Sequence, residues 1–443
     1  MRDGRKRVIV IGGGFAGLNL VRHLDINLFD VTLVDRNNFH SFPPLYYQVA
    51  SSGLDAASIC FPFRRELRKR HGDRVKFNMG EVHDIDMEKR VVHTSIETLP
   101  FDILVIAAGT TNNYFGMEKL DEKVYTLKST AQALRCRNDI LSLLERASVA
   151  KTADERRRLL NFVVIGGGPA GVEIAGALGE MKRYILPREY PSIPQDDVTI
   201  TIVEGTDKLL RTMSPQSSVS STRELKQLMV CVKTGTVMKR YDRENDLVEF
   251  ADGSTIPASM VIWTAGVTSV QFNWTGCETG FVGHANRLMT DTHCAIMGLK
   301  DVYALGDIAL MEGDPNFPKG HPQLAQVAIQ QGHLLARNLN LRESGKENKM
   351  KEFRYNDKGS MATVGRNRAV VDLKRFHFHG FVAWCVWMFI HLISILGMRN
   401  KLTVLLNWIW AYFNYSTSLR LIIHPSRLPL GDDLRYFGPN PDD

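Results

Sequence analysis

The sequence has no paired cysteines. Its six cysteines are scattered over 443 residues, with no C-x-x-C motif and no two at the spacing of metal ligands. Isolated thiols of this kind are typical of a reducing compartment. A thiol relay needs two sulfurs within reach of each other, so we expect neither dithiol chemistry nor a metal site. The six are Cys60, Cys136, Cys231, Cys277, Cys294 and Cys385.

Two further absences concern the ends of the chain. The first residues are basic but lead into a β-branched run and glycines instead of the apolar core of a secretory signal, so we expect no such signal. No Asp or Glu occurs in residues 373–431, although lysines, arginines and four of the six tryptophans lie there. Uniform positive charge with tryptophan and apolar stretches is typical of a surface that faces anionic lipid.

Two apolar stretches in this acid-free segment differ in character. Residues 380–397 are just long enough to be considered as a membrane-spanning helix, but His391 and Ser394 weaken that interpretation. In residues 402–413 the apolar side chains recur on one helical face. We favour a helix that lies in the membrane interface over one that spans it. A buried core or dimer contact stays open for the first stretch.

Length and charge set only broad limits. The chain is long enough for two or three domains with proper cores. Its net charge of +7 fits nucleic acid, a membrane surface or neither, so the position of the basic residues decides more than their number. Because the acid-free segment combines them with tryptophans, we expect a lipid surface and no nucleic acid as partner.

The chain is organised around a glycine-rich turn in residues 8–17, VIVIGGGFAG. Gly12, Gly14 and Gly17 have the G-x-G-x-x-G spacing. Glycine is needed there for a tight turn, for close approach of the backbone to a pyrophosphate, and for packing of helix on strand. Asp35 ends the next apolar run about 20 residues on, where a carboxylate binds a ribose hydroxyl. This pattern predicts a dinucleotide site.

The whole pattern recurs in residues 162–171, FVVIGGGPAG. Gly166, Gly168 and Gly171 repeat the spacing, and Glu204 ends the following apolar run. Two separate fingerprints imply two dinucleotides. No arginine directly follows Glu204, and its carboxylate would accept both ribose hydroxyls of NAD while repelling the 2′-phosphate of NADP. NADH is therefore the favoured donor.

Several other segments indicate how the chain is arranged. Residues 38–53 are rich in aromatic, proline and turn residues, which predicts a functional, ordered loop. The basic run in residues 64–70 is interpreted as a solvated helix face in preference to a ligand site. Residues 103–109 predict a buried strand where the chain leaves the first dinucleotide domain, and residues 261–266 a strand that returns to it. Residues 127–158 are helix-like.

Four polar residues are candidates for chemistry. Glu173 falls on the first turn of the second fingerprint's helix, where it either stabilises the helix or faces the reaction centre. Asp307 follows a strand in VYALGD and is a candidate second clamp on a flavin. Gln330 and Gln331 carry neutral amides that can donate to the carbonyl oxygens of a quinone, although a polar helix face also explains them.

These residues together resemble the type II NADH dehydrogenases, monotopic flavoenzymes that pass electrons from NADH to quinone. The glycine motifs are shared with many flavoenzymes, whereas AQVAIQQG combined with the cationic, tryptophan-rich tail is more specific. The calcium-loop pattern of some eukaryotic members is absent. Beside the first glycine motif, the likeness rests on FPPLYYQVA, GGGPAGVE, TAGV, ALGD, AQVAIQQG, VGRNRAVVDL and RNKLTVLLNWIWAYF.

The resemblance implies an α/β fold with two Rossmann-like dinucleotide-binding domains, for FAD and NADH, plus a C-terminal membrane-associating helical segment. The implied boundaries are residues 1–116 for the first part of the FAD-binding domain and 117–267 for the NADH-binding domain. Residues 268–345 would complete the FAD-binding domain, and residues 346–443 would anchor the protein to the membrane. The lipid surface would be met through residues 376–425.

The resemblance also implies roles for single residues. FAD would be bound tightly by Gly12, Gly14, Gly17, Asp35 and Asp307, and NADH by Gly166, Gly168, Gly171 and Glu204. Further cofactor-binding residues would be Phe15, Ala16, Arg36, Ala108, Gly266 and Ala325. The quinone end would be formed by Tyr46, Tyr47, Gln48, Gln330 and Gln331, and the catalytic residues would be Glu173, Gln330 and Gln331.

The implied activity is hydride transfer from NADH to flavin N5, followed by electron transfer to a membrane quinone without ion pumping. Such an enzyme would sit peripherally on the cytoplasmic face of a respiratory membrane, and a homodimer is left open. One alternative is a sulfide:quinone oxidoreductase, which needs cysteines near the flavin. The other is a non-catalytic redox sensor that binds FAD and NADH at the membrane.

Overall fold

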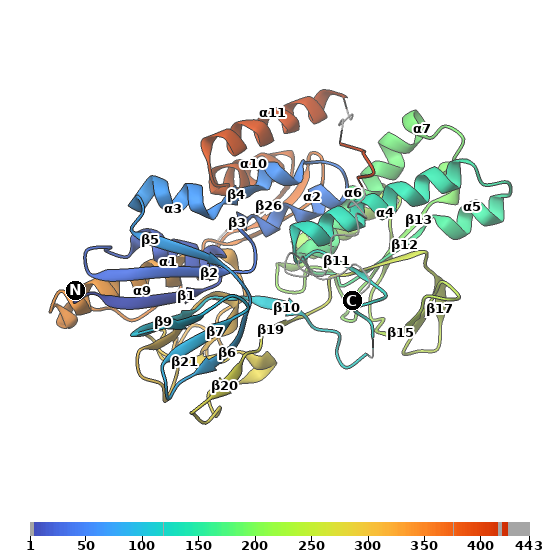
Figure 1. Cartoon of the computed structure of the whole chain (residues 1–443). Helices are drawn as coiled ribbons and strands as arrows, with labels where there is room; N and C mark the ends of the chain where they lie inside the picture. Colours follow the sequence, from blue (N-terminus) through green and yellow to red (C-terminus); the bar gives the residue numbers. More distant parts are fainter. Residues whose placement is uncertain (1–3, 118, 375, 415–418, 424–443) are drawn as a thin grey trace, which may run out of the picture.

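Two five-stranded parallel sheets form the framework of the computed structural model (Figure 1). The structure describes residues 4–117, 119–374, 376–414 and 419–423. The first sheet, in spatial order, consists of β22 (Val302–Ala304), β9 (Ile103–Ile106), β1 (Lys6–Ile11), β2 (Phe29–Asp35) and β5 (Val75–Met79). The second consists of β11 (Tyr125–Thr126), β18 (Met260–Trp263), β12 (Asn161–Ile165), β13 (Thr199–Val203) and β14 (Cys231–Lys233). Strands buried on both faces of a parallel sheet are expected to be continuously apolar, as β1 and β12 are.

Each glycine turn joins the central strand of a sheet to a helix. The first turn joins β1 to α1 (Phe15–His23), which packs on α9 (Ala325–Glu343). The second joins β12 to α6 (Pro169–Glu180), whose apolar side chains share a core with α4 (Thr130–Ser148) and α8 (Pro215–Gln227). The predicted α/β fold with two Rossmann-like halves is confirmed.

The chain passes between the two sheets along a short antiparallel pair. Strand β10 (Thr110–Asn112) follows β9 and pairs with β19 (Val267–Ser269). The prediction that residues 261–266 return to the first sheet is wrong, because β18 lies in the second sheet between β11 and β12. The chain returns only after β18. A short apolar run suits either parallel sheet, so its sequence cannot assign it to one of them.

Two segments differ from their predicted secondary structure. Instead of a loop, residues 38–53 contain β3 (Phe39–Ser41), a 3-10 turn and helix α2 (Tyr46–Ala50). Helix α2 packs on α4 and α6, and the burial of its aromatic side chains stabilises it. The turn residues around it in the sequence had indicated a loop instead. The helix-like residues 127–158 form two helices, α4 and α5 (Ala153–Leu159), each with its own side-chain N-cap.

The C-terminal part consists of an antiparallel sheet and two helices. The sheet has β24 (Ser360–Gly365), β25 (Arg368–Asp372) and β26 (His377–Gly380), and it is followed by α10 (Phe381–Ser394) and α11 (Met398–Asn414). Strand β24 packs on α6, and α10 packs on β25. Among the described residues, no helix combines the length and the apolar character needed to cross a bilayer. Positions 415–418 and 424–425 of the expected lipid surface lie outside the described residues.

Shorter elements complete the described chain. A four-stranded sheet contains β20 (Asn273–Thr275), β6 (Val82–Asp86), β7 (Val91–Thr94) and β8 (Thr98–Pro100), and a three-stranded one contains β15 (Met238–Asp242), β16 (Leu247–Phe250) and β17 (Thr255–Pro257). Two-stranded pairs are formed by β3 with β4 (Cys60–Pro62) and by β21 (Leu288–Thr290) with β23 (Ala309–Met311). The remaining α-helices are α3 (Phe63–His71) and α7 (Leu186–Glu189).

Candidate functional site

The first glycine turn combines close packing at two glycines with open space at a third. Gly12 has a φ of +96°, and a Cβ at Gly17 would lie 2.0 Å from the carbonyl oxygen of Gly12, so helix and strand touch here. Gly14 is the N-cap of α1, faces open space and provides no side-chain cap. The first N–H groups of α1 are therefore available to an anion, which the helix dipole also favours. The turn fits a pyrophosphate.

Asp35 stands beside this turn at the end of β2. Its Oδ2 accepts a hydrogen bond of 2.7 Å from the N–H of Gly13, and its Oδ1 accepts one of 2.8 Å from Asn37. Burial raises the pKa of the carboxyl, and these two bonds oppose the shift. A carboxylate oxygen has two lone pairs, so each can still accept a ribose hydroxyl. The neighbouring Arg36 is exposed.

A second group of predicted residues converges on the same turn from β9, β22 and α9. A Cβ on Gly12 would lie 2.9 Å from the Cα of Ala108, and one on Gly306 would lie 3.3 Å from the Cβ of Ala16. Ala325 begins α9, whose N-cap provides no side-chain hydrogen bond. The N-terminus of α9 can therefore also meet an anion or a carbonyl oxygen.

Asp307 lies next to this helix end, close to two cations. Burial raises the pKa of Asp307, while the charges of Lys128 and Arg287 oppose that shift. Lys128 donates from Nζ to the Oγ1 of Thr110 at 2.9 Å, and burial lowers its pKa. A carboxylate held between two cations beside an open helix end can accept hydroxyl groups of a ligand.

The second glycine turn repeats the first in detail. Gly166 has a φ of +111°, a Cβ at Gly171 would lie 1.9 Å from its carbonyl oxygen, and Gly168 faces open space. Glu204 takes the place of Asp35. Its Oε2 accepts a hydrogen bond of 2.6 Å from Gly167, and its Oε1 accepts one of 2.7 Å from Thr206. The two turns thus have equivalent geometry, and each fits the pyrophosphate of a dinucleotide.

Gly266 borders the second turn's sheet where β18 ends. It has a φ of +81°, and a Cβ there would lie 2.5 Å from the ring of Phe115. Any larger residue would displace that ring. Gly266 therefore leaves space for the Phe115 ring at the point where the chain passes between the two sheets.

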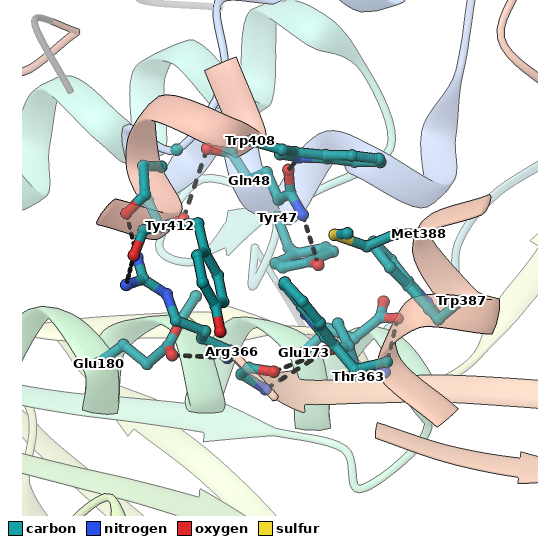
Figure 2. Close-up of a pocket in the computed structure, with 16 residues that line it drawn as sticks. Tyr47, Gln48, Glu173, Glu180, Thr363, Arg366, Trp387, Met388, Trp408 and Tyr412 are labelled. Carbon is teal, nitrogen blue, oxygen red and sulfur yellow. Dashed lines mark hydrogen bonds between the residues drawn. The ribbon is translucent and has the colours of Figure 1, made fainter. Parts of the chain in front are cut away.

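A cavity of about 140 Å³ lies between α6 and the C-terminal helices (Figure 2). Its volume is close to the roughly 150 Å³ of an apolar cavity that accepts benzene, so it can hold one six-membered ring. The chain contributes to its walls from α2, α6, the turn after β24, α10 and α11. The side chains labelled in the figure are Tyr47, Gln48, Glu173, Glu180, Thr363, Arg366, Trp387, Met388, Trp408 and Tyr412.

Hydrogen bonds join the cavity's walls across long sequence separations. The indole of Trp408 donates to Oε1 of Gln48 at 2.9 Å, and Nε2 of Gln48 donates to the hydroxyl of Tyr47 at 2.8 Å. The guanidinium of Arg366 donates to the carbonyl oxygens of Ala411 and Tyr412 at the end of α11. These bonds hold α11 over the cavity, as Figure 2 shows.

Two carboxyl groups from α6 reach the cavity, that of the buried Glu173 and that of the half-buried Glu180. Burial raises the pKa of Glu173 to about 8. Two neighbouring N–H groups oppose this shift: the backbone N–H of Thr363, which donates to Oε1 of Glu173 at 3.5 Å, and the indole N–H of Trp387. The Trp387 indole makes no hydrogen bond of normal geometry among the described residues. Burial also raises the pKa of Glu180, whose Oε1 accepts a hydrogen bond of 2.6 Å from the N–H of Arg366. Glu173 can therefore carry a proton at neutral pH, whereas the charges of Arg366 and Arg368 oppose the shift in the pKa of Glu180.

The structure does not gather all predicted quinone residues at one place. Tyr47, Gln48 and Glu173 line the cavity, but the Tyr46 hydroxyl turns to Ser41 at 2.5 Å. Gln331 is buried, and its Oε1 accepts a hydrogen bond of 2.7 Å from the N–H of Gly306. The side-chain amide of Gln330 makes two hydrogen bonds with the backbone of Asn356, one as donor and one as acceptor. The two glutamines hold backbone in place and line no part of this cavity.

Sequence reasoning missed several residues of both sites. Trp387 and Trp408 come from segments that were interpreted for membrane contact, and Arg366 lies in the VGRNRAVVDL motif, for which no residue role was inferred. His40, whose Nδ1 lies 2.9 Å from the carbonyl oxygen of Gly13, is buried behind the first turn, and Phe15 packs edge-on against its ring. The signal available for the tryptophans was their concentration in the tail, but only tertiary contacts show which of them turn inward.

No cysteine is among the described residues that line the cavity. Cys136 and Cys294 are fully buried in two different cores, and burial raises the pKa of both thiols. Cys60 pairs with the hydroxyl of Thr130 at 3.4 Å. Thiols with raised pKa values are poor nucleophiles and poor sulfur carriers.

Two protein families match the sequence. Residues 6–332 match the pyridine nucleotide-disulphide oxidoreductase family, and residues 358–414 match the NDH2 C-terminal domain. The chain is 32% identical to the type II NADH:quinone oxidoreductase Ndh of Mycobacterium tuberculosis, over 91% of this chain and 87% of that protein. It is 29% identical to a mitochondrial internal alternative NAD(P)H-ubiquinone oxidoreductase of Solanum tuberosum, over 92% and 86% of the two chains.

Solved structures share the fold. NDH2 of Plasmodium falciparum, solved in complex with NADH, superposes with a TM-score of 0.86 at 20% identity and covers 95% of this chain and all of that one. The sulfide:quinone oxidoreductase of Aquifex aeolicus superposes with a TM-score of 0.67 at 18% identity, covering 95% and 96%. From the sequence matches, the chain belongs to the pyridine nucleotide-disulphide oxidoreductase family and, within it, to the type II NADH:quinone oxidoreductases.

Proposed function

We propose that this chain oxidises NADH and delivers the electrons, through a tightly bound FAD, to a quinone in the α6–α11 cavity. The observation that carries the proposal is the combination of two open glycine turns with a separate ring-sized cavity. FAD would be held by Gly12, Gly14, Gly17, Asp35 and Asp307, and NADH by Gly166, Gly168, Gly171 and Glu204. When bound, the flavin would supply the redox chemistry, because it can accept hydride from NADH and pass electrons to a quinone.

The assignment of the two nucleotides follows from their surroundings. The first turn is enclosed by residues of β9, β22 and α9, which suits a ligand that stays bound. At the second turn, Thr264 and Ala265 follow β18 and lie beside Gly166, and we assign this turn to the NADH that comes and goes. On this basis residues 1–116 with 268–345 form the FAD-binding domain, and residues 117–267 form the NADH-binding domain.

The cavity residues would bind the quinone and provide protons. Quinone reduction takes up two protons with its two electrons, and Glu173 is a buried acid whose raised pKa of about 8 keeps a proton available at neutral pH. Tyr47 and Gln48 offer a hydroxyl and an amide to the quinone oxygens. For Gln330 and Gln331 we propose an indirect role, because they position Gly306 and Asn356.

The exposed faces of α10 and α11 would rest on the lipid from which the quinone enters. Their outward side chains are apolar, and one-sided apolar helices of this kind lie in the membrane interface. We propose a peripheral position on the cytoplasmic face of a respiratory membrane, through the described part of residues 376–425. A homodimer formed by the same face is the competing explanation. The most exposed side chains are Val382, Phe389, Met398, Leu406, Trp410 and Phe413.

The proposal is tested by separating the two halves of the reaction. Anaerobic NADH should bleach the flavin absorbance of the purified protein, and a soluble quinone should restore it. A non-catalytic sensor would not reoxidise with quinone, and this result would overturn the proposal. A sulfide:quinone enzyme would be bleached by sulfide and lose that response when Cys60, Cys136 and Cys294 are replaced by serine.

The cavity assignment has its own test within this experiment. Glu173→Gln removes the proton but keeps the size and a hydrogen-bond acceptor for Thr363. We expect flavin reduction by NADH to be unchanged and reoxidation by quinone to slow by about tenfold or more. If Glu173→Gln slows only the NADH step, the cavity is not the quinone site.

A further inference from the structure

Helix α3 carries a strip of exposed cations that have no acidic partner among the described residues. Arg64, Arg65, Arg68 and Lys69 are all exposed, and they are related by helical spacings of three and four, so they share one face. Within the described chain, no ion pair or hydrogen bond engages any of these four side chains. The opposite face is buried through Phe63 and Leu67.

The only acidic residue of α3 does not neutralise this strip. Glu66 is buried, and its Oε1 lies 3.0 Å from Nε of Arg22 and 3.1 Å from Nε of Arg70. Its charge is therefore already shared between two other guanidinium groups. The four cations of the strip remain uncompensated by their own helix.

Helix stability does not explain the strip. Cations near a helix C-terminus are favoured by the dipole, which accounts for Arg68 and Lys69 in the last turn. Arg64 and Arg65 lie in the first turn, where the positive end of the dipole disfavours them. Arg64 and Arg65 therefore gain nothing from the dipole, and their exposed charged ends are open to a contact outside the protein.

The strip is continuous with the apolar face of the C-terminal helices. The ring of Phe61, two residues before α3, lies so close to Gly397 in the α10–α11 turn that a Cβ there would be 2.4 Å away. Nδ2 of Asn400 donates to the carbonyl oxygen of Cys60 at 2.8 Å. The guanidinium of Arg65 lies 5.6 Å from the centre of the Phe61 ring.

The guanidinium stems extend the same arrangement along α3. Arg64 lies 5.2 Å from the centre of the Phe77 ring, so both first-turn arginines rest on aromatic rings and keep their charged ends outward. Figure 1 shows α3 along the same edge of the molecule as α10 and α11. Met398 and Leu402 are the first apolar residues of α11 after Gly397, and both are exposed.

We propose that α3 is a second membrane contact that binds anionic lipid headgroups through Arg64, Arg65, Arg68 and Lys69. This inference rests on the proposed interfacial position of α10 and α11 and adds lipid specificity to it. The apolar helices provide affinity for any bilayer, while the strip selects an anionic one. Each cation near such a surface contributes about 1 kcal/mol of attraction, screened by salt.

The test compares vesicles of two compositions. Wild type and the variant Arg64→Gln, Arg65→Gln, Arg68→Gln, Lys69→Gln are sedimented with vesicles of phosphatidylcholine alone, or with roughly one quarter phosphatidylglycerol added. We expect the variant to partition at least about tenfold more weakly onto the anionic vesicles and equally onto the neutral ones. NADH oxidation with a soluble quinone in detergent should be the same for both proteins, which shows that the variant is folded.

A matched control removes the same charge elsewhere. The variant Lys151→Gln, Lys300→Gln, Lys319→Gln, Lys349→Gln neutralises four exposed lysines outside α3, α10 and α11. An equal loss in this control would overturn the inference, because net charge alone would then set the affinity. Equal binding of wild type to both vesicles would overturn it too, but would leave the interfacial helices intact.

Two other outcomes identify a different cause. If wild type sediments with neither vesicle, the membrane position itself fails, and the inference fails with it. If vesicle binding is unchanged in the α3 variant while a gel shift of RNA by wild type is lost, the strip is a nucleic-acid contact and the inference is overturned.

Discussion

At the scale of single residues, the chemistry depends on where the chain buries a carboxyl group. Glu173 is enclosed by aromatic side chains and receives a single long hydrogen bond of 3.5 Å, from Thr363. Glu204 receives two short ones from backbone N–H groups, at 2.6 and 2.7 Å. We therefore propose different tasks for the two glutamates, with Glu173 holding a proton and Glu204 accepting hydroxyl groups.

Glu173 makes the stability of the protein pH-dependent. Its pKa in the folded protein is about 8, while a glutamate in an unfolded chain ionises near pH 4.3. Between these values the folded state binds one proton more, so the free energy of unfolding falls as pH rises, by up to about 1.4 kcal/mol per pH unit. We expect Glu173→Gln to abolish this part of the decline in urea titrations between about pH 5 and about pH 8. Parallel curves for both proteins would show that Glu173 is not buried in its acid form.

Glu204 sets the preference between the two nicotinamide donors. We expect Glu204→Ala to raise the KM for NADH about tenfold, since one hydrogen-bonded anchor for the ribose is lost. The activity with NADPH should rise relative to that with NADH, because the negative charge that repels a 2′-phosphate is gone. The check is steady-state kinetics with both donors, and flavin content serves as the control for folding. An unchanged KM for NADH would remove the ribose assignment.

At the scale of elements, each strand–glycine–helix unit combines two demands in one turn. Gly171 must be small because α6 packs against the turn itself, whereas Gly168 faces open space. The first demand concerns folding and the second concerns a ligand. The same division holds for Gly17 and Gly14 in the first unit.

This division predicts opposite outcomes for two alanine substitutions. Gly171→Ala places a Cβ within 1.9 Å of the carbonyl oxygen of Gly166 and should lower the melting temperature by several degrees, as overpacking by about 1–3 kcal/mol does. Gly168→Ala should leave the melting temperature within about a degree but weaken NADH binding, because its Cβ enters the phosphate space. Thermal melts and NADH titrations distinguish the two. Similar melting temperatures would contradict the assigned packing.

At the scale of the whole molecule, α11 faces two environments at once. Trp408 turns inward to Gln48 and Val404 is buried, while Leu402, Leu406 and Phe413 are exposed by 53%, 64% and 76%. Removing the entire helix would open the cavity as well as the surface. The exposed side chains therefore have to be changed without the buried ones.

The variant Leu402→Gln, Leu406→Gln, Phe413→Gln makes this separation. We expect it to be released from membranes while it keeps its flavin and its activity with a soluble quinone, since burial of each such side chain in lipid is worth about 1.5–3 kcal/mol. Membrane sedimentation and gel filtration check the outcome. If membrane binding persists and a dimer dissociates, the face is a subunit contact.

The fold and its two glycine turns were predictable because they depend on local patterns. A continuous apolar strand, three glycines at fixed spacing and an acid at the end of the next strand specify a βαβ unit within a few dozen residues. The positions of Gly12, Gly166, Asp35 and Glu204 follow from that pattern. The family resemblance then indicated what the two sites bind.

The cavity depends on contacts between residues that lie far apart in the chain, so only the tertiary structure could decide it. Tyr47, Glu173, Arg366 and Trp408 come from four separate segments, and no periodicity within any one of them indicates the others. The sequence by itself determined the two dinucleotide units and the cationic, tryptophan-rich end. Packing of α2, α6 and α11 decided which polar groups lose water and hold protons, because burial is a property of the assembled molecule and not of a residue type.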